Sequence, residues 1–143
     1  MVWKCMSWNI QGWGGRQDKT KKMMKIKSEI EGYGIIILTE THLSKEEEEI
    51  NKMEKHLQEY NLFHIHDKEN ASGRKVVTIG IKKNRIEIEN IEIKTDQGKE
   101  EEGRWIRVTL NKILDKPLNI WGIYAPTNAK NRKKNGSGNL EEK

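Results

Sequence analysis

Two polar side chains follow apolar, strand-like segments at points suited to bind a metal ion and a phosphate. Asn9 comes after residues 2–8, which alternate like a strand, and Glu40 comes after the apolar run of residues 35–38. Proteins usually hold Mg²⁺ with one or two carboxylates, while water and phosphate fill its other positions. Either residue alone is more often an ordinary turn or surface residue, so a third segment is needed to make the pair informative.

The third segment, residues 119–128, is a predicted strand that ends in a Tyr-Ala-Pro-Thr-Asn sequence. Together the three segments contain SWNIQG, LTETHL and IYAPTN, in this order along the chain. They resemble the endonuclease/exonuclease/phosphatase superfamily, which is also called DNase-I-like. The wording is most similar to the apurinic-type endonuclease domain of LINE-like retrotransposons. The resemblance covers residues 2–132, and residues 103–106 resemble the Gly-Arg strand start of that family.

This resemblance implies a role for each matching residue. Asn9, Tyr124 and Asn128 would be catalytic, lying in one cleft around the scissile phosphate of DNA, and Glu40 would be the ligand of Mg²⁺. We expect Asn9, Glu40 and Tyr124 at the same edge of one sheet. His42 follows Glu40 by two residues and either supports the metal site or is a structural histidine.

The resemblance stops before the second half of the family's active site. Relatives carry an Asp-x-Asn motif and later an Asp-His pair, but none of the four aspartates here is followed two residues on by Asn. No histidine occurs after His66. The resemblance therefore implies a truncated endonuclease domain with little activity alone, which either lacks its C-terminal half or associates with itself. Two alternatives stay open: a basic, non-catalytic nucleic-acid-binding remnant, and an unrelated small structural module.

Two further sets of residues have ordinary structural interpretations. His64 and His66 have a spacing that could chelate a metal, but no third ligand motif accompanies them. We expect both to be ordinary strand histidines. Cys5 lies in an apolar strand, where a buried structural thiol is the usual outcome.

The elements that position these residues alternate along the chain, which predicts an α/β fold: half of a four-layer α/β sandwich with a mixed β-sheet and flanking helices. Helices are predicted over residues 19–31 and after a capping box formed by Ser44 and Glu47. The domain is expected to span residues 1–128, followed by a polar, disordered tail over 129–143. Further strands are predicted at residues 60–66, 76–81, 86–93 (with a bulge), 104–110 and 118–124.

Composition is compatible with this interpretation without specifying it. The 143 residues fit one domain, with 34% hydrophobic residues, 34% charged residues and a formal net charge of +5. A basic balance suits a polyanionic partner such as DNA. A single cysteine excludes an internal disulfide. Neither a leader-like apolar segment nor a run long enough to cross a membrane occurs in the sequence, so we expect an intracellular protein, with nucleus and cytoplasm both open.

Overall fold

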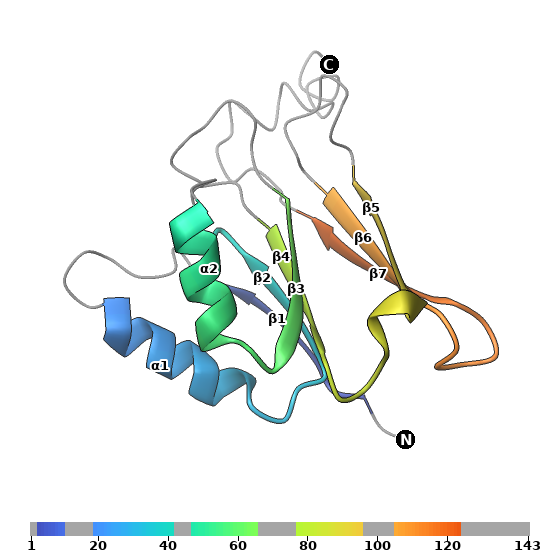
Figure 1. The fold of residues 1–143 in the computed structure, drawn as a ribbon, viewed down its shortest axis with the longest axis horizontal. Helices are drawn as coiled ribbons and strands as arrows, with labels where there is room; N and C mark the ends of the chain where they lie inside the picture. Colours follow the sequence, from blue (N-terminus) through green and yellow to red (C-terminus); the bar gives the residue numbers. More distant parts are fainter. Residues whose placement is uncertain (1–2, 11–18, 42–46, 66–76, 96–104, 124–143) are drawn as a thin grey trace, which may run out of the picture.

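A computed structural model describes residues 3–10, 19–41, 47–65, 77–95 and 105–123 of the chain (Figure 1). This part forms two α-helices, seven β-strands and one 3₁₀ helix. Helices and strands alternate in the first half, and only strands and the 3₁₀ helix follow. The elements are β1 (Cys5–Asn9), α1 (Lys19–Ile30), β2 (Ile35–Thr39), α2 (Glu47–His56), β3 (Tyr60–Ile65), β4 (Val77–Lys82), β5 (Ile91–Thr95), β6 (Trp105–Leu110) and β7 (Leu118–Ile123).

The strands form two separate sheets. The first has the order β1-β2-β4-β3, in which β1 and β2 are parallel and the other neighbours are antiparallel. The second has the order β5-β6-β7 and is antiparallel throughout. The first sheet is therefore mixed, as the sequence predicts, and its only parallel pair among the described strands joins the two segments that carry Asn9 and Glu40.

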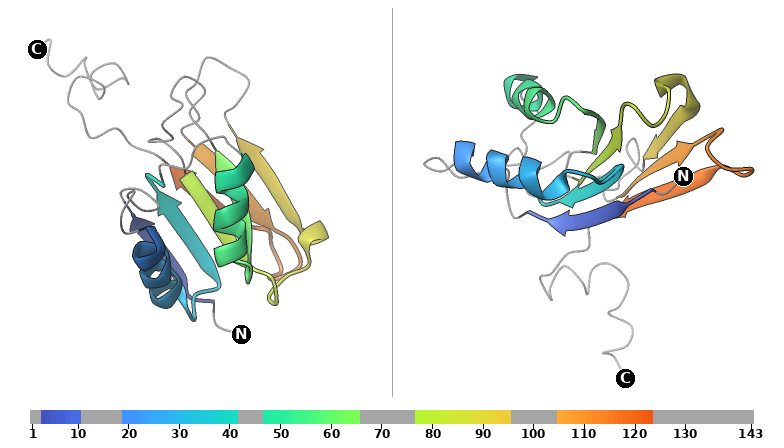
Figure 2. Two further views of the ribbon diagram at one scale, coloured as in Figure 1. Left: turned by 60° about the vertical axis from the view of Figure 1, so that its left-hand side comes forward. Right: turned by 90° about the horizontal axis from the view of Figure 1, so that it is seen from below.

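Two hydrophobic cores hold the layers together, one on each face of the first sheet. The alternation of β2 divides its side chains between them, because Ile36 and Leu38 face the helices whereas Ile35 and Ile37 face the second sheet. Figure 2 shows both helices on one side of the first sheet and β5 to β7 on the other. The described residues thus form three layers, helices, sheet and sheet, and the predicted mixed α/β class is confirmed.

The helices form where the spacing of apolar residues predicts them. Met23, Ile26 and Ile30 of α1 recur on one face at helical spacing, and all three are buried against the sheet. Gly32 ends α1 with a left-handed backbone (φ 89°), a conformation that glycine adopts without steric cost. No helix in the described part of the chain is long and apolar enough to cross a membrane.

One predicted strand and one predicted burial are wrong. The prediction of a strand over residues 86–93 fails in its first half, because Ile88–Asn90 forms a 3₁₀ helix and β5 begins only at Ile91. The turn absorbs the slip in alternation, with the Asn90 N–H donating to the Glu87 carbonyl at 2.9 Å. Cys5 was expected to be buried, yet its side chain is exposed. Neighbouring atoms still desolvate the thiol enough to raise its pKa.

Candidate active site

The parallel pairing of β1 and β2 brings the first two predicted site residues to one end of the first sheet. Asn9 is the register partner of Thr39, the residue directly before Glu40. The N–H of Ile10 donates to the Thr39 carbonyl at 3.1 Å, which continues the pairing beyond Asn9. Since neighbouring strands lie about 4.8 Å apart, Asn9 and Glu40 are held on adjacent backbones. Asn9 is exposed and Glu40 is partly buried.

The backbone at Glu40 is unusual. Its φ is 52°, in the left-handed region, which is costly for a residue with a side chain. Thr41, the next residue, is fully buried, and its hydroxyl oxygen has no hydrogen-bond partner within the described structure. A buried hydroxyl without a partner normally costs free energy, and such groups are enriched where a ligand or ion supplies the missing contact. The strand end at Glu40 is therefore strained on its backbone and unsatisfied beside it.

The third predicted strand reaches the same end of the molecule from the other sheet. Gly122 of β7 is close to Val77 and Ile79: a Cβ added to it would lie 2.7 Å from Cγ1 of Val77 and 3.2 Å from Cδ1 of Ile79. Val77 is in turn the register partner of Thr39. In Figure 1 the arrowheads of β1, β2 and β7 point toward the same side of the molecule. The expectation of one shared sheet is wrong, because β7 belongs to the second sheet.

The remaining predicted site residues lie outside the described part of the chain. Tyr124 follows directly after the last residue of β7, and Asn128 lies further on. His42 follows Thr41, the last described residue after β2. The capping box of Ser44 and Glu47 cannot be compared for the same reason. These residues keep the roles that the resemblance implies for them as predictions.

The donors at this end of the sheet suit a hard cation that retains much of its water. Within the described ranges, no three His, Cys, Asp or Glu side chains gather closely enough to enclose an ion. Glu40 supplies one carboxylate, Asn9 an amide and Thr41 a hydroxyl without a partner. Mg²⁺ binds oxygen, and one or two carboxylates are enough because it keeps several water molecules. The residues present therefore fit Mg²⁺ better than zinc, which prefers nitrogen and sulfur ligands.

His64 has a structural partner on the neighbouring strand. Its Nδ1 lies 2.7 Å from the hydroxyl oxygen of Thr78, with the two residues in direct register between β3 and β4. This contact agrees with the interpretation of His64 as an ordinary strand histidine. His66 lies outside the described residues.

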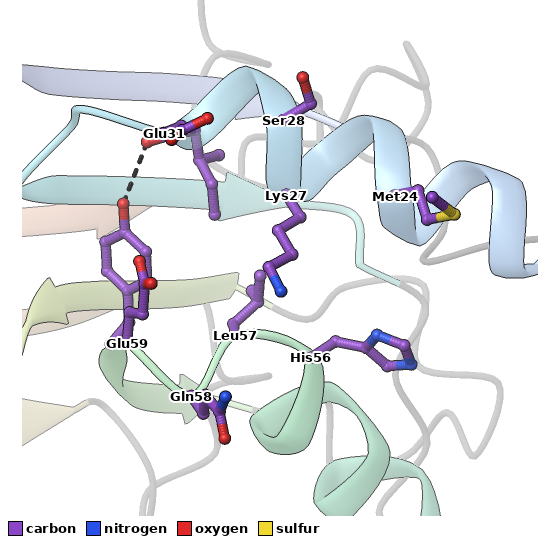
Figure 3. Close-up of a pocket in the computed structure, with 10 residues that line it drawn as sticks. Met24, Lys27, Ser28, Glu31, His56, Leu57, Gln58 and Glu59 are labelled. Carbon is purple, nitrogen blue, oxygen red and sulfur yellow. Dashed lines mark hydrogen bonds between the residues drawn. The ribbon is translucent and has the colours of Figure 1, made fainter.

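A pocket of about 400 Å³ opens between the C-terminal parts of α1 and α2 (Figure 3). At its inner end the Tyr60 hydroxyl lies 2.6 Å from the carbonyl oxygen of Tyr33 and 3.0 Å from that of Ile30. Tyr60 is paired with Lys82, the last residue of β4, whereas Thr39 is paired with Val77, the first. The pocket thus lies at the opposite end of the sheet from Asn9 and Glu40 and is separate from the candidate site.

Sequence reasoning missed Thr41 and the aromatic face of the second sheet. Thr41 had one available signal, its position directly after a proposed metal ligand. Trp105 and Trp121 lie on the outer face of β6 and β7, with ring centroids 5.2 Å apart. Arg107 stacks over Trp121 at 5.6 Å. Outward-facing tryptophans in two predicted strands are visible in the sequence, but only strand pairing shows that they meet.

Solved structures with a similar fold are known, although no protein-family model and no curated protein matches the sequence. An AP endonuclease from Leishmania major superposes with a TM-score of 0.68 at 16% identity, covering 98% of this chain and 46% of that one. A mannosyl-6-phosphatase from Bacteroides thetaiotaomicron gives 0.59 at 12% identity and covers 99% and 58%.

A third similar structure, an endonuclease/exonuclease/phosphatase family protein from Bacteroides thetaiotaomicron, gives a TM-score of 0.57 at 11% identity and covers 95% and 55%. At such identities the likeness establishes the fold alone. This chain spans about half the length of the structures it matches. It has the fold of part of an endonuclease/exonuclease/phosphatase, or DNase-I-like, domain.

Proposed function

We propose that this chain is the N-terminal half of a Mg²⁺-dependent DNA endonuclease domain of the retrotransposon type and does not cleave DNA by itself. The observation that carries the proposal is the parallel pairing of β1 and β2, which sets Asn9 beside Thr39 and so next to Glu40. The AP endonuclease among the similar structures supports DNA as the substrate class.

Each residue at the strand ends has a distinct part in this proposal. Glu40 holds the metal through its carboxylate, and Asn9 donates from its amide to the scissile phosphate. Bound Mg²⁺ would polarise the phosphate and stabilise charge on the leaving oxygen. Tyr124, one residue beyond β7, orients the phosphate from the second sheet, and Asn128 lines the same cleft. The hydroxyl of Thr41 is buried directly behind Glu40 in the sequence and supports that strand end.

The groups that would position and deprotonate a water molecule are not found in the sequence. In the family that Asp-x-Asn and Asp-His supply them, and neither motif occurs here. Loss of general acid–base catalysis alone costs about 10²–10⁴ in rate. Metal binding without these groups polarises a phosphate but does not generate the nucleophile, so the isolated chain should leave DNA intact.

A plasmid-nicking assay tests this proposal. Supercoiled plasmid is incubated in Mg²⁺ with the chain alone, and then with the chain plus the part of the Leishmania AP endonuclease that it does not cover. We expect no nicking by the chain alone and nicking by the mixture that disappears with Glu40→Ala. Robust nicking by the chain alone that Glu40→Ala abolishes would refute the claim of inactivity. Nicking by the mixture that survives Glu40→Ala would refute the role of Glu40.

A second candidate function is nucleic-acid binding without catalysis, which the exposed aromatic face favours. Trp121 is 47% exposed, and Arg107 stacks on its ring. Aromatic and arginine side chains on a sheet face are a common platform for single-stranded bases. Binding of this kind would weaken with salt and need no divalent metal. Binding that requires Mg²⁺ and Glu40 would instead favour the endonuclease-derived site.

A further inference from the structure

One strand of the first sheet has an uncovered inner face. The side chains of β1 alternate, so Met6 and Trp8 pack toward the helices while Cys5 and Ser7 face the side of the second sheet. Both of these inward residues are exposed. On the neighbouring strand β2, Ile35 faces the same side and is buried. The second sheet therefore covers β2 but not β1.

The position of β7 explains why the cover stops there. Gly122 is seated against Val77 and Ile79 of β4, so β7 lies over the middle of the first sheet rather than over its β1 edge. Among the described strands, β7 pairs only with β6, and its other edge is open. Figure 2, in its right-hand view, shows β1 and β7 running along the same side of the molecule. One more strand beside β7 would complete the second sheet over β1.

The outer surface beside this open edge is also apolar. Trp121 and Ile123 alternate outward from β7 and are 47% and 59% exposed. Trp105 is the register partner of Ile123, and its ring contacts that of Trp121. An open strand edge flanked by large exposed side chains is a typical site for addition of a strand from another segment.

We propose that the open edge of β7 binds a further β-strand from a polypeptide that carries the remaining half of this fold, and that this strand extends the second sheet across β1. The proposal rests on the proposed function for the identity of that polypeptide. The length of the similar structures supports it, because each contains about as much chain again as the part that this protein covers. A second copy is the poorer occupant, since each chain carries a net charge of +5 and two copies repel.

Cys5 is a built-in reporter for this docking, because it is the single cysteine of the chain and lies on the uncovered face. The probe is the part of the Leishmania AP endonuclease chain left uncovered in the superposition, added as a separate polypeptide. Maleimide labelling of Cys5 is followed by the intact mass of this chain. We expect labelling to slow about tenfold or more, saturably with probe. Unchanged labelling at every probe concentration would overturn the proposal.

Two matched variants locate the docking surface. Trp121→Ser removes the exposed ring beside the open edge and should weaken protection of Cys5 by about tenfold or more, as expected when a central aromatic contact is lost. Leu114→Ser is the control, since Leu114 is 60% exposed in the connection between β6 and β7. It should change protection less than twofold, and circular dichroism confirms that both variants fold. Equal effects of the two variants would overturn the assignment of the surface.

Other occupants give distinct results in the same experiment. Protection of Cys5 that rises with the concentration of this chain alone, together with a dimer in sedimentation, would replace the proposal with a second copy. Protection by a single-stranded oligonucleotide would replace it with nucleic acid. Glu40→Ala keeps the docking surface intact, so protection that persists in this variant without any nicking by the wild-type mixture would refute the proposed function and leave this inference standing.

Discussion

Gly122 lets the two sheets approach each other at the strand that leads to Tyr124. A Cβ added at this position would lie 2.7 Å from Cγ1 of Val77, closer than non-bonded carbons approach, and 3.2 Å from both Cγ2 of Ile106 and Cδ1 of Ile79. All three of these neighbours are fully buried. Gly122→Ala must therefore push the sheets apart or force a buried side chain from its rotamer.

The expected cost follows from that crowding. Overpacking a core by one methyl group typically destabilises by about 1–3 kcal/mol. Val77→Ala removes the carbon with the shortest contact and by itself should cost about 2 kcal/mol through lost burial and a residual cavity. In the double variant the new methyl group occupies the space that Cγ1 vacates. The two costs should therefore fall short of their sum by about 1–2 kcal/mol.

Urea unfolding of the four proteins in this double-mutant cycle measures the coupling. Free energies of unfolding are compared by fluorescence of the tryptophans, with m-values checked for equality between variants. Additivity within about 0.5 kcal/mol would show that the residues are not in contact. It would also refute the seating of β7 over β4 and, with it, the inferred approach of β7 to the strand end at Glu40.

Three further substitutions test other parts of the structure. Lys112→Gly should raise the free energy of unfolding by up to about 1 kcal/mol in urea titrations, because φ at Lys112 is 66° and glycine relieves that strain at some cost in unfolded-state entropy. Glu40→Gly should likewise be neutral or stabilising while abolishing metal binding in calorimetry; a loss of more than about 1 kcal/mol would contradict the left-handed backbone there. Tyr60→Phe should flatten the alkaline loss of stability. Burial, then Glu59 and Glu31, raise the pKa of Tyr60 above its ordinary 10.0, so the folded state holds the proton longer and stability falls as pH rises past 10. An unchanged profile of unfolding midpoint against pH from 9 to 11 in Tyr60→Phe would refute this assignment.

Local pattern predicted the elements where burial follows a single period. The stripe of Met23, Ile26 and Ile30 specifies a helix, and the apolar run from Ile35 specifies a strand covered on both faces, as the structure has them. The same reasoning failed at Ile88, which is apolar and in phase with Ile86 yet 60% exposed in a 3₁₀ turn. Alternation alone cannot show whether a facing layer exists.

Properties that depend on the pairing of distant strands were beyond the sequence. The exposure of Cys5 depends on how far the second sheet extends over β1, which no feature of residues 5–9 records. Assignment of β7 to the second sheet, and the meeting of Trp105 with Trp121, depend on the register of β6 and β7. The positions of Asn9 and Glu40 at the ends of their strands were readable from the sequence, and their adjacency followed only from the parallel pairing.

The most direct test of the account is where a divalent ion binds. Mn²⁺ is titrated into the ¹⁵N-labelled chain, and paramagnetic broadening of amide signals is mapped by NMR. Since Asn9 is paired with Thr39 and Glu40 follows, broadening should centre on residues 9–10 and 39–41 and vanish in Glu40→Ala. Broadening centred on the helix pocket around Glu31 and Glu59, or broadening near Asn9 that persists without Glu40, would contradict the account.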